Sequence, residues 1–319
     1  MSQHSESKQQ RNPCRLFGLL ARASPVGVLF RRGPSHWVRL IKWHTDSDTF
    51  EFGQWFHGRI YERRCDLSPN GKLLIYFASK FNKRTLEDLP TSLERLDARI
   101  SGETVNLDGH YTYAWTAVSK PPWLTALALW PKGDCWHGGG LFESDTALWL
   151  NHLPGLDRPH PNHIPKGLHV RANPEAHGED YPIYSKRLQR DGWRLEQKGE
   201  CAHSRKNGRV AKLGEVCAKA CPSGSFDLLM NLTAVNSKSY GGRSVLEFCM
   251  RRSSTGQLIE IGRATWADFD QRGRLVFAKD GSLFVCEETS SGDVALRLIH
   301  DFNDDKPMSV PPPAEATVW

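Results

Sequence analysis

Short runs of alternating apolar and polar residues recur along most of the chain. The first two runs occupy residues 26–30 and 37–43, and the dipeptide Gly33-Pro34 between them is typical of a turn. Further strands are predicted at 50–59, 72–78, 111–118, 124–130, 146–150, 183–188, 226–232, 244–250, 275–277, 283–286 and 294–299. Helical spacing of leucines occurs only in 84–96, where Pro90 limits any helix to a turn or two on either side. The pattern predicts an all-β fold.

Two segments far apart in the sequence share one pattern. Residues 66–74 (DLSPNGKLL) and 268–276 (DFDQRGRLV) both place an aspartate, an apolar residue, a glycine, a basic residue and a leucine at the same offsets. Weaker echoes occur around Gly133 and Gly192, so that glycine turns recur at intervals of about 60 residues, with one longer gap. This spacing predicts a repeated array of roughly 60-residue β units.

At these residues the sequence resembles the β-propeller repeats of WD-repeat and TolB-like proteins, in which a strand–turn–strand hairpin marks each blade. Residues 66–77 carry the best match and residues 268–284 the next. The resemblance implies a β-propeller-like array, and a multi-sheet β-sandwich is the alternative. We expect one β-rich domain over 14–302, preceded by a polar, disordered N-terminus at 1–13 and followed by a Pro-rich tail at 303–319.

The charge is concentrated at the N-terminus. The chain of 319 residues has 42 Lys and Arg against 36 Asp and Glu, yet residues 1–42 contain eight basic residues and a single acid, Glu6. A basic region of this kind can bind the phosphates of nucleic acid. The alternative is that its basic residues are the outward-facing side chains of ordinary strands. There is no apolar run long enough to cross a membrane, and the aromatic content is too high for a disordered chain. We expect a cytoplasmic protein with no membrane partner.

The eight cysteines are too scattered for a disulfide scaffold. Cys201, His203, Cys217 and Cys221 supply four possible zinc ligands within a short stretch, although neither spacing is that of a zinc knuckle. The alternative is that these thiols are reduced and structural. We predict no metal and no cofactor, and the sequence leaves the zinc question at these four residues open.

Two irregular segments offer candidate ligand-binding residues. One follows a predicted strand and contains Trp136, His137, Gly138 and Gly139, where glycines let the backbone approach a ligand and the aromatic rings can stack on it. The other is the Pro- and His-rich loop 152–182, in which His160 and His163 suit a metal or proton transfer. We expect these two histidines to point outward into solvent.

Motifs for covalent catalysis are missing. The sequence has no Gly-x-Ser-x-Gly elbow and no His-Glu-x-x-His motif. Carboxylates that could pair as the acid and base of a glycosidase are Glu143, Asp145, Asp268 and Asp270. Aspartates beside hairpin turns more often cap the turn, and we expect Asp268 to do so by analogy with Asp66.

The sequence therefore favours a non-enzymatic β scaffold that binds a protein or a small molecule through its loops. One alternative is a hydrolase with a central cleft fed by loop 152–182. A second alternative is a nucleic-acid-binding protein that uses the basic N-terminal region. The partner itself is not evident from the sequence.

Overall fold

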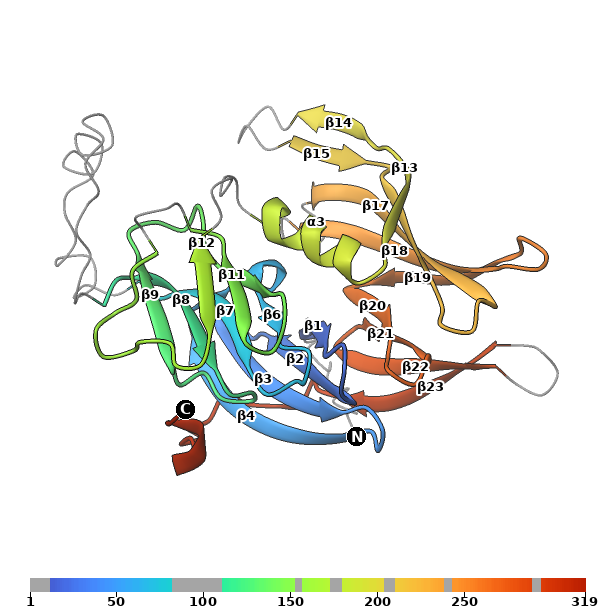
Figure 1. The fold of residues 1–319 in the computed structure, drawn as a ribbon. Helices are drawn as coiled ribbons and strands as arrows, with labels where there is room; N and C mark the ends of the chain where they lie inside the picture. Colours follow the sequence, from blue (N-terminus) through green and yellow to red (C-terminus); the bar gives the residue numbers. More distant parts are fainter. Residues whose placement is uncertain are drawn as a thin grey trace, which may run out of the picture.

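The fold consists of several antiparallel sheets packed against one another (Figure 1). The structure is a computed structural model, and it describes residues 12–81, 111–152, 157–172, 180–203, 210–237, 243–288 and 294–319. Within these ranges the one α-helix is α3 (Tyr181–Arg190). The all-β class predicted from the sequence is confirmed. The short helical turns predicted within 84–96 lie outside the described residues, as do residues 1–11 of the N-terminus.

The first two sheets are meanders in sequence order. The first contains β1 (Arg15–Leu20), β2 (Val26–Arg32), β3 (Trp37–His44) and β4 (Thr49–His57). The second contains β5 (Arg59–Ile60), β7 (Leu74–Ser79), β8 (Ala114–Ser119) and β9 (Ala128–Lys132), with β6 (Asp66–Leu67) also paired to β7 and the short 3₁₀ turn η1 (Glu62–Arg64) between β5 and β6.

The third sheet follows, and α3 separates it from the last two. It contains β10 (Gly140–Phe142), β11 (Ala147–Leu150) and β12 (His169–Ala172), of which β11 and β12 are parallel. The fourth contains β13 (Arg194–Gln197), β16 (Val216–Ala220), β17 (Phe226–Ser237), β18 (Arg243–Arg252) and β19 (Leu258–Ala264), and the hairpin β14 (Glu200–His203) and β15 (Val210–Leu213) leaves it. The fifth contains β20 (Trp266–Phe269), β21 (Leu275–Lys279), β22 (Ser282–Glu288) and β23 (Val294–Asp301).

Each sheet packs on the next through its own apolar cluster. The first sheet shares one cluster with the second and another with the fifth. The second shares a cluster with the third, and the fourth with the fifth. Helix α3 fills the remaining interval, because its Ile183 packs on Leu141 and Trp149 of the third sheet while its Leu188 packs on the cluster of the fourth and fifth. Figure 1 shows α3 between these two sheets.

One strand prediction was wrong, and the strand β1 was not predicted. Residues 183–188 form part of α3, because Pro182 stands in the first helical turn, where its missing N–H costs nothing, and Ile183 and Arg187, one turn apart, are both buried. The first strand begins at Arg15 rather than in the run 26–30. Strand β1 shows no alternation because residues on both of its faces, including Leu16 and Leu19, are buried between neighbouring sheets.

The two similar segments form equivalent turns that differ by one residue. The amide of Gly71 donates to the carbonyl of Ser68, and the amide of Gly273 donates to that of Asp270, with φ of 72° and 75° at the two glycines. Leu67 pairs with Leu74, whereas Phe269 pairs with Leu275. The first loop is therefore one residue longer. As a result Leu275 is fully buried as expected, while Leu73 is only half-buried and Leu74 takes the core position.

The described basic side chains of the N-terminal region form ion pairs and hydrogen bonds within the protein. Arg15 and Arg32 both pair with Glu62, and Lys42 pairs with Glu51. Arg22 donates to the carbonyl of Phe142, and the other two basic residues of this region, Arg31 and Arg39, donate to the carbonyl of Phe302 and to Asp305. Six of the eight basic residues thus have partners within the protein, and Lys8 and Arg11 lie outside the described residues.

The C-terminal segment returns across the molecule without forming a strand. Phe302 is fully buried, and the short 3₁₀ turn η3 (Ala314–Ala316) lies near the end. Lys120 donates to the carbonyl of Glu315, and Trp319 packs on the apolar cluster of the second and third sheets. The segment therefore ties the fifth sheet to the second. Of the helices described, none has the length and apolar character needed to span a membrane.

Glu62 anchors β1 and β2 to η1, and its removal should destabilise the fold in a pH-dependent way. Burial acts to raise the pKa of Glu62, but Arg32 and Arg15 outweigh it and hold the pKa below its ordinary value. The ion pairs therefore contribute stability above the ordinary pKa of about 4.3, and this contribution is lost as the pH falls through the lower pKa of the folded state. We expect Glu62→Gln to lower the free energy of unfolding by about 1.5–3 kcal/mol at pH 7.

The measurement is urea unfolding at pH 7 and at a series of lower pH values. The difference between wild type and Glu62→Gln should shrink as the medium becomes acidic. Glu287→Gln is the matched control, because Glu287 pairs with Arg297 on the surface and should change stability little. Equal effects of the two substitutions would contradict this role of Glu62.

Candidate functional site

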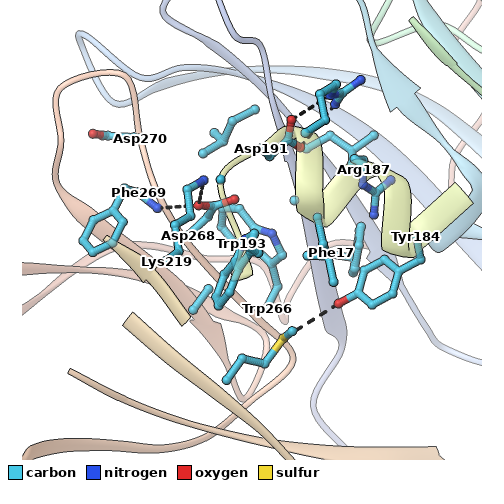
Figure 2. Close-up of a pocket in the computed structure, with 18 of the residues that line it drawn as sticks. Phe17, Tyr184, Arg187, Asp191, Trp193, Lys219, Trp266, Asp268, Phe269 and Asp270 are labelled. Atoms are coloured by element: carbon cyan, nitrogen blue, oxygen red, sulfur yellow. Dashed lines mark hydrogen bonds and ion pairs between the residues drawn. The ribbon is translucent and has the colours of Figure 1, made fainter. Parts of the chain in front are cut away.

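A cavity of about 440 Å³ lies where β1, α3, the fourth sheet and β20 meet. Three chain segments supply most of its wall: residues 17–22, residues 184–193 and residues 265–271. Side chains of β16, β17 and β18 close the remaining side. Figure 2 shows charged groups and aromatic rings from these elements facing one another across the cavity. Its volume falls within the range of small-molecule sites.

One side of the cavity is fixed by an ion pair between Asp66 and Arg190. The guanidinium of Arg190 donates to both carboxylate oxygens of Asp66, at 2.6 and 2.9 Å, and also donates to Asp191. Asp66 in turn accepts the backbone N–H of Phe142 at 2.8 Å. This contact joins β6, β10 and α3. Burial opposes the charge on Arg190, but the hydrogen bonds that it donates to Asp66 and Asp191 prevail and raise its pKa.

The opposite side carries a second ion pair, between Lys219 of β16 and Asp268 of β20. The Lys219 Nζ lies 2.5 Å from Asp268 Oδ1, which also accepts the N–H of Phe269. Burial raises the pKa of the Asp268 carboxyl, Lys219 opposes the shift, and the charge of nearby Asp191 adds to it, so that the net change is upward. Asp268 therefore does not cap its turn, which corrects the expectation from the sequence.

The capping role belongs to Asp270, two residues further on. Its carboxylate accepts the backbone N–H groups of Arg272 and Arg274, and it forms an ion pair with the Arg274 side chain at 2.7 Å. In the equivalent turn, Ser68 takes this position and accepts the N–H of Leu73. Of the four carboxylates considered for acid–base chemistry, only Asp268 turns a partly exposed carboxylate toward the cavity. Glu143 pairs with Arg171, and Asp145 accepts the N–H of Asn70.

Aromatic rings form much of the cavity wall. Trp193 follows α3 and Trp266 begins β20, and both are almost completely buried. Gly18 of β1 makes room for Trp266, because a Cβ at this position would lie 2.6 Å from the indole ring. Across the cavity, Phe17 and Tyr184 flank the guanidinium of Arg187, at 5.4 and 5.5 Å from its central carbon. The described residues that line the cavity include no serine, cysteine or histidine.

The predicted histidine pair is not solvated as we expected. His160 is buried and stacks on Tyr111, with ring centroids 4.1 Å apart. His163 lies between the Tyr111 hydroxyl, at 3.1 Å, and the carbonyl of Ala126, at 3.0 Å. The expectation failed because the backbone of this loop hydrogen-bonds to Leu129 of β9, which turns both rings inward. The two imidazoles are neighbours, with centroids 5.6 Å apart, but they do not line the cavity.

The glycine-containing segment after β9 packs against the second sheet. A Cβ at Gly138 would lie 2.3 Å from the ring of Phe77, and one at Gly139 would lie 1.9 Å from the carbonyl oxygen of Arg64. The amide of Gly139 donates to the hydroxyl of Thr116. Trp136 is 56% exposed and His137 is buried. These residues do not line the central cavity either, and the close approach that requires the glycines is to the protein itself.

The proposed zinc ligands are only partly described. Cys217 is half-buried on β16 and Cys221 is buried in the turn that follows. The backbone of Cys201 and His203 lies in β14, a hairpin strand outside the sheet that contains β16. Within the described side chains, no group of three or more His, Cys, Asp and Glu residues could hold a metal ion. The side chains of Cys201 and His203 are not among them, so the zinc alternative stays a prediction.

Comparison with known proteins finds distant structural neighbours. No protein-family model and no characterised protein match the sequence. The structure is similar to tricorn protease with a TM-score of 0.22 and 10% identity, over 93% of this chain and 22% of the protease. It is similar to Pyrococcus horikoshii acylaminoacyl peptidase with a TM-score of 0.27 and 12% identity, over 90% of this chain and 45% of the peptidase. The chain thus spans less than half of either neighbour.

Substitution of Gly139 tests whether the glycine segment serves packing. Gly139 and Gly167 both have positive φ, at 80° and 67°, but a Cβ at Gly167 would have no atom within 4 Å. We expect Gly139→Ala to cost about 3–5 kcal/mol, from overpacking added to backbone strain, and Gly167→Ala to cost about 1 kcal/mol from strain alone. Thermal and urea unfolding measure the difference. Similar small losses for both would contradict the packing role.

Proposed function

We propose that the chain is a β-propeller-like scaffold of five sheets whose central cavity binds a small ligand without covalent chemistry. The propeller interpretation is supported by the order of the sheet contacts: each sheet packs on the next, and α3 bridges the third and fourth. The innermost strands also meet, because β1 contacts β6 and β20, β6 contacts β10, and β10 contacts α3. Propellers place their blades around a central channel in this way.

The observation that carries the binding proposal is the cavity's composition. Aromatic walls of Trp193 and Trp266 stand beside polar groups with partly exposed atoms, namely Lys219 and Asp268 with side chains 17% and 16% exposed. An apolar pocket with a few convergent polar groups is the usual form of a small-molecule site. The described lining contains no serine, cysteine or histidine, which are the usual nucleophiles and base of acyl-enzyme chemistry. Its one threonine, Thr265, donates its hydroxyl to the carbonyls of Leu16 and Ala278.

A hydrolase is the second candidate, and Asp268 is the residue that favours it. A half-buried carboxyl with a raised pKa can donate a proton to a leaving group, and Asp191 offers a second carboxylate on the same cavity. Both groups already hold internal partners, Lys219 and Arg190. We therefore rank acid–base hydrolysis below simple binding.

A cavity-filling substitution tests the binding proposal. Leu246 of β18 lines the cavity and is half-buried, so Leu246→Trp should occupy part of the space and abolish ligand binding. Leu258→Trp is the matched control, because Leu258 lies on β19, is 58% exposed and does not line the cavity. In a thermal-shift screen of a fragment library, compounds that raise the Tm of the wild type should still stabilise Leu258→Trp and fail to stabilise Leu246→Trp.

Circular dichroism of both variants establishes that the fold is retained. If no compound stabilises the wild type, or if compounds stabilise all three proteins equally, the cavity is not the binding site.

The hydrolase candidate makes a different prediction. Chromogenic esters, anilides and glycosides should not be turned over if the cavity only binds. Turnover that falls with Asp268→Asn by at least about 100-fold, the usual contribution of a general acid, would establish the hydrolase in place of the scaffold. Turnover unaffected by this substitution would point to a contaminant or to another site.

A further inference from the structure

Each charged group that lines the cavity has a polar partner within the protein. Lys219 pairs with Asp268, and Arg190 pairs with Asp66 and Asp191. The remaining charges are held by neighbours, since Asp270 pairs with Arg274, while Arg187 and Arg22 donate to the carbonyls of Cys65 and Phe142. Four acidic and four basic side chains line the cavity, so it has no net formal charge. A charged ligand that used Lys219, Arg190, Asp191 or Asp268 would have to break one of these ion pairs.

The aromatic rings on one side of the cavity already contact a cation of the protein. The guanidinium of Arg187 lies over the rings of Phe17 and Tyr184, and that of Arg63 lies 4.9 Å from the ring of Tyr184. These contacts supply the cation–π interactions that an ammonium ligand would seek on this side. A further cation here would also meet the positive charge of Arg187.

The cations Arg190 and Lys219, which could bind an anionic ligand, already have carboxylate partners. Every nitrogen of the Arg190 guanidinium has an acceptor: Nε bonds Asp191, and both terminal nitrogens bond Asp66. The ammonium of Lys219 is held by Asp268 at 2.5 Å. Taking either cation away would leave a carboxylate unpaired in a partly buried site, which is strongly unfavourable.

What stays available is hydrogen bonding without net charge. Asp268 Oδ1 accepts from Lys219 and from the N–H of Phe269, while its Oδ2 has no recorded partner within the described part of the chain. Lys219 has three N–H donors and uses one on Asp268. Figure 2 shows these two side chains beside Trp193, with Trp266 next to it. A carboxylate oxygen, an ammonium and the small exposed part of an indole ring, Trp193 being 6% exposed, thus stand together on one wall.

We propose that the cavity binds a neutral carbohydrate, an inference that rests on the proposed function of the cavity as a binding site. A sugar ring carries hydroxyl groups along its edge, each of which both donates and accepts hydrogen bonds, as the Asp268–Lys219 pair requires. Its C–H faces are apolar and pack on an indole ring. The ring brings no charge, so it leaves both ion pairs intact.

The experiment uses the full chain on an array of neutral glycans, each printed beside its uronic-acid and amino-sugar counterparts. We expect retention on one or more neutral glycans and binding at least about tenfold weaker on the charged counterparts. Asp268→Asn keeps the shape of the side chain but weakens the hydrogen bonds to the sugar, and should lower the affinity by about 10–100-fold in calorimetric titration with the retained glycan.

Two further variants separate the outcomes. Leu246→Trp should abolish retention, whereas Asp227→Asn, which breaks ion pairs with Arg194 and Arg251 away from the cavity, should leave it unchanged. Preferential retention of the charged counterparts would overturn the carbohydrate proposal in its neutral form. If no glycan is retained but fragments bind and are blocked by Leu246→Trp, the carbohydrate class is wrong and the binding site stands. If nothing binds in either experiment, both proposals fall.

Discussion

The contact between Asp66 and Arg190 is the constraint on which the centre of the molecule depends. Two charges taken out of water are costly, and they are stable here because both carboxylate oxygens and every guanidinium nitrogen have partners. The same carboxylate accepts the N–H of Phe142, so a single side chain fixes β6, β10 and α3. The end of α3 is thereby held at the cavity, where Asp191 and Trp193 follow directly in sequence.

Pairing with distant groups also accounts for the six described basic residues of the N-terminal region. Sequence shows eight basic residues with one acid, but the acids that neutralise them lie elsewhere: Glu62 follows β5, and Asp305 follows the last strand. Arg31 needs no acid at all, since it donates to backbone carbonyls of Phe302 and Asn303. The charge of a sequence segment therefore does not show which side chains stay unpaired after folding, because their partners can be distant in the sequence.

Sequence reasoning succeeded where a signal is local. Strand alternation and the turns at Gly71 and Gly273 depend on neighbouring residues, and they predicted the all-β class and about half of the described strands. It failed for β1, which is buried on both faces, and for residues 183–188, where Pro182 opens a helix. The residues that line the cavity were not predicted, because they come from β1, α3 and β20. No short sequence motif indicates that these three elements lie together. Asp268 was noticed, but its pairing with Lys219 was not.

The same pairing links stability to recognition in the cavity. An active site usually holds a group with an unmet electrostatic need, because that need is satisfied only by substrate or transition state. Here Asp268 and Asp191 already have Lys219 and Arg190, and removing either partner would destabilise the fold as well as the site. The hydrogen-bonding capacity beside Trp193 and Trp266 that no internal partner uses is available to a ligand without destabilising the fold. The proposed binding of an uncharged polar ring would leave the central contacts of the fold unchanged.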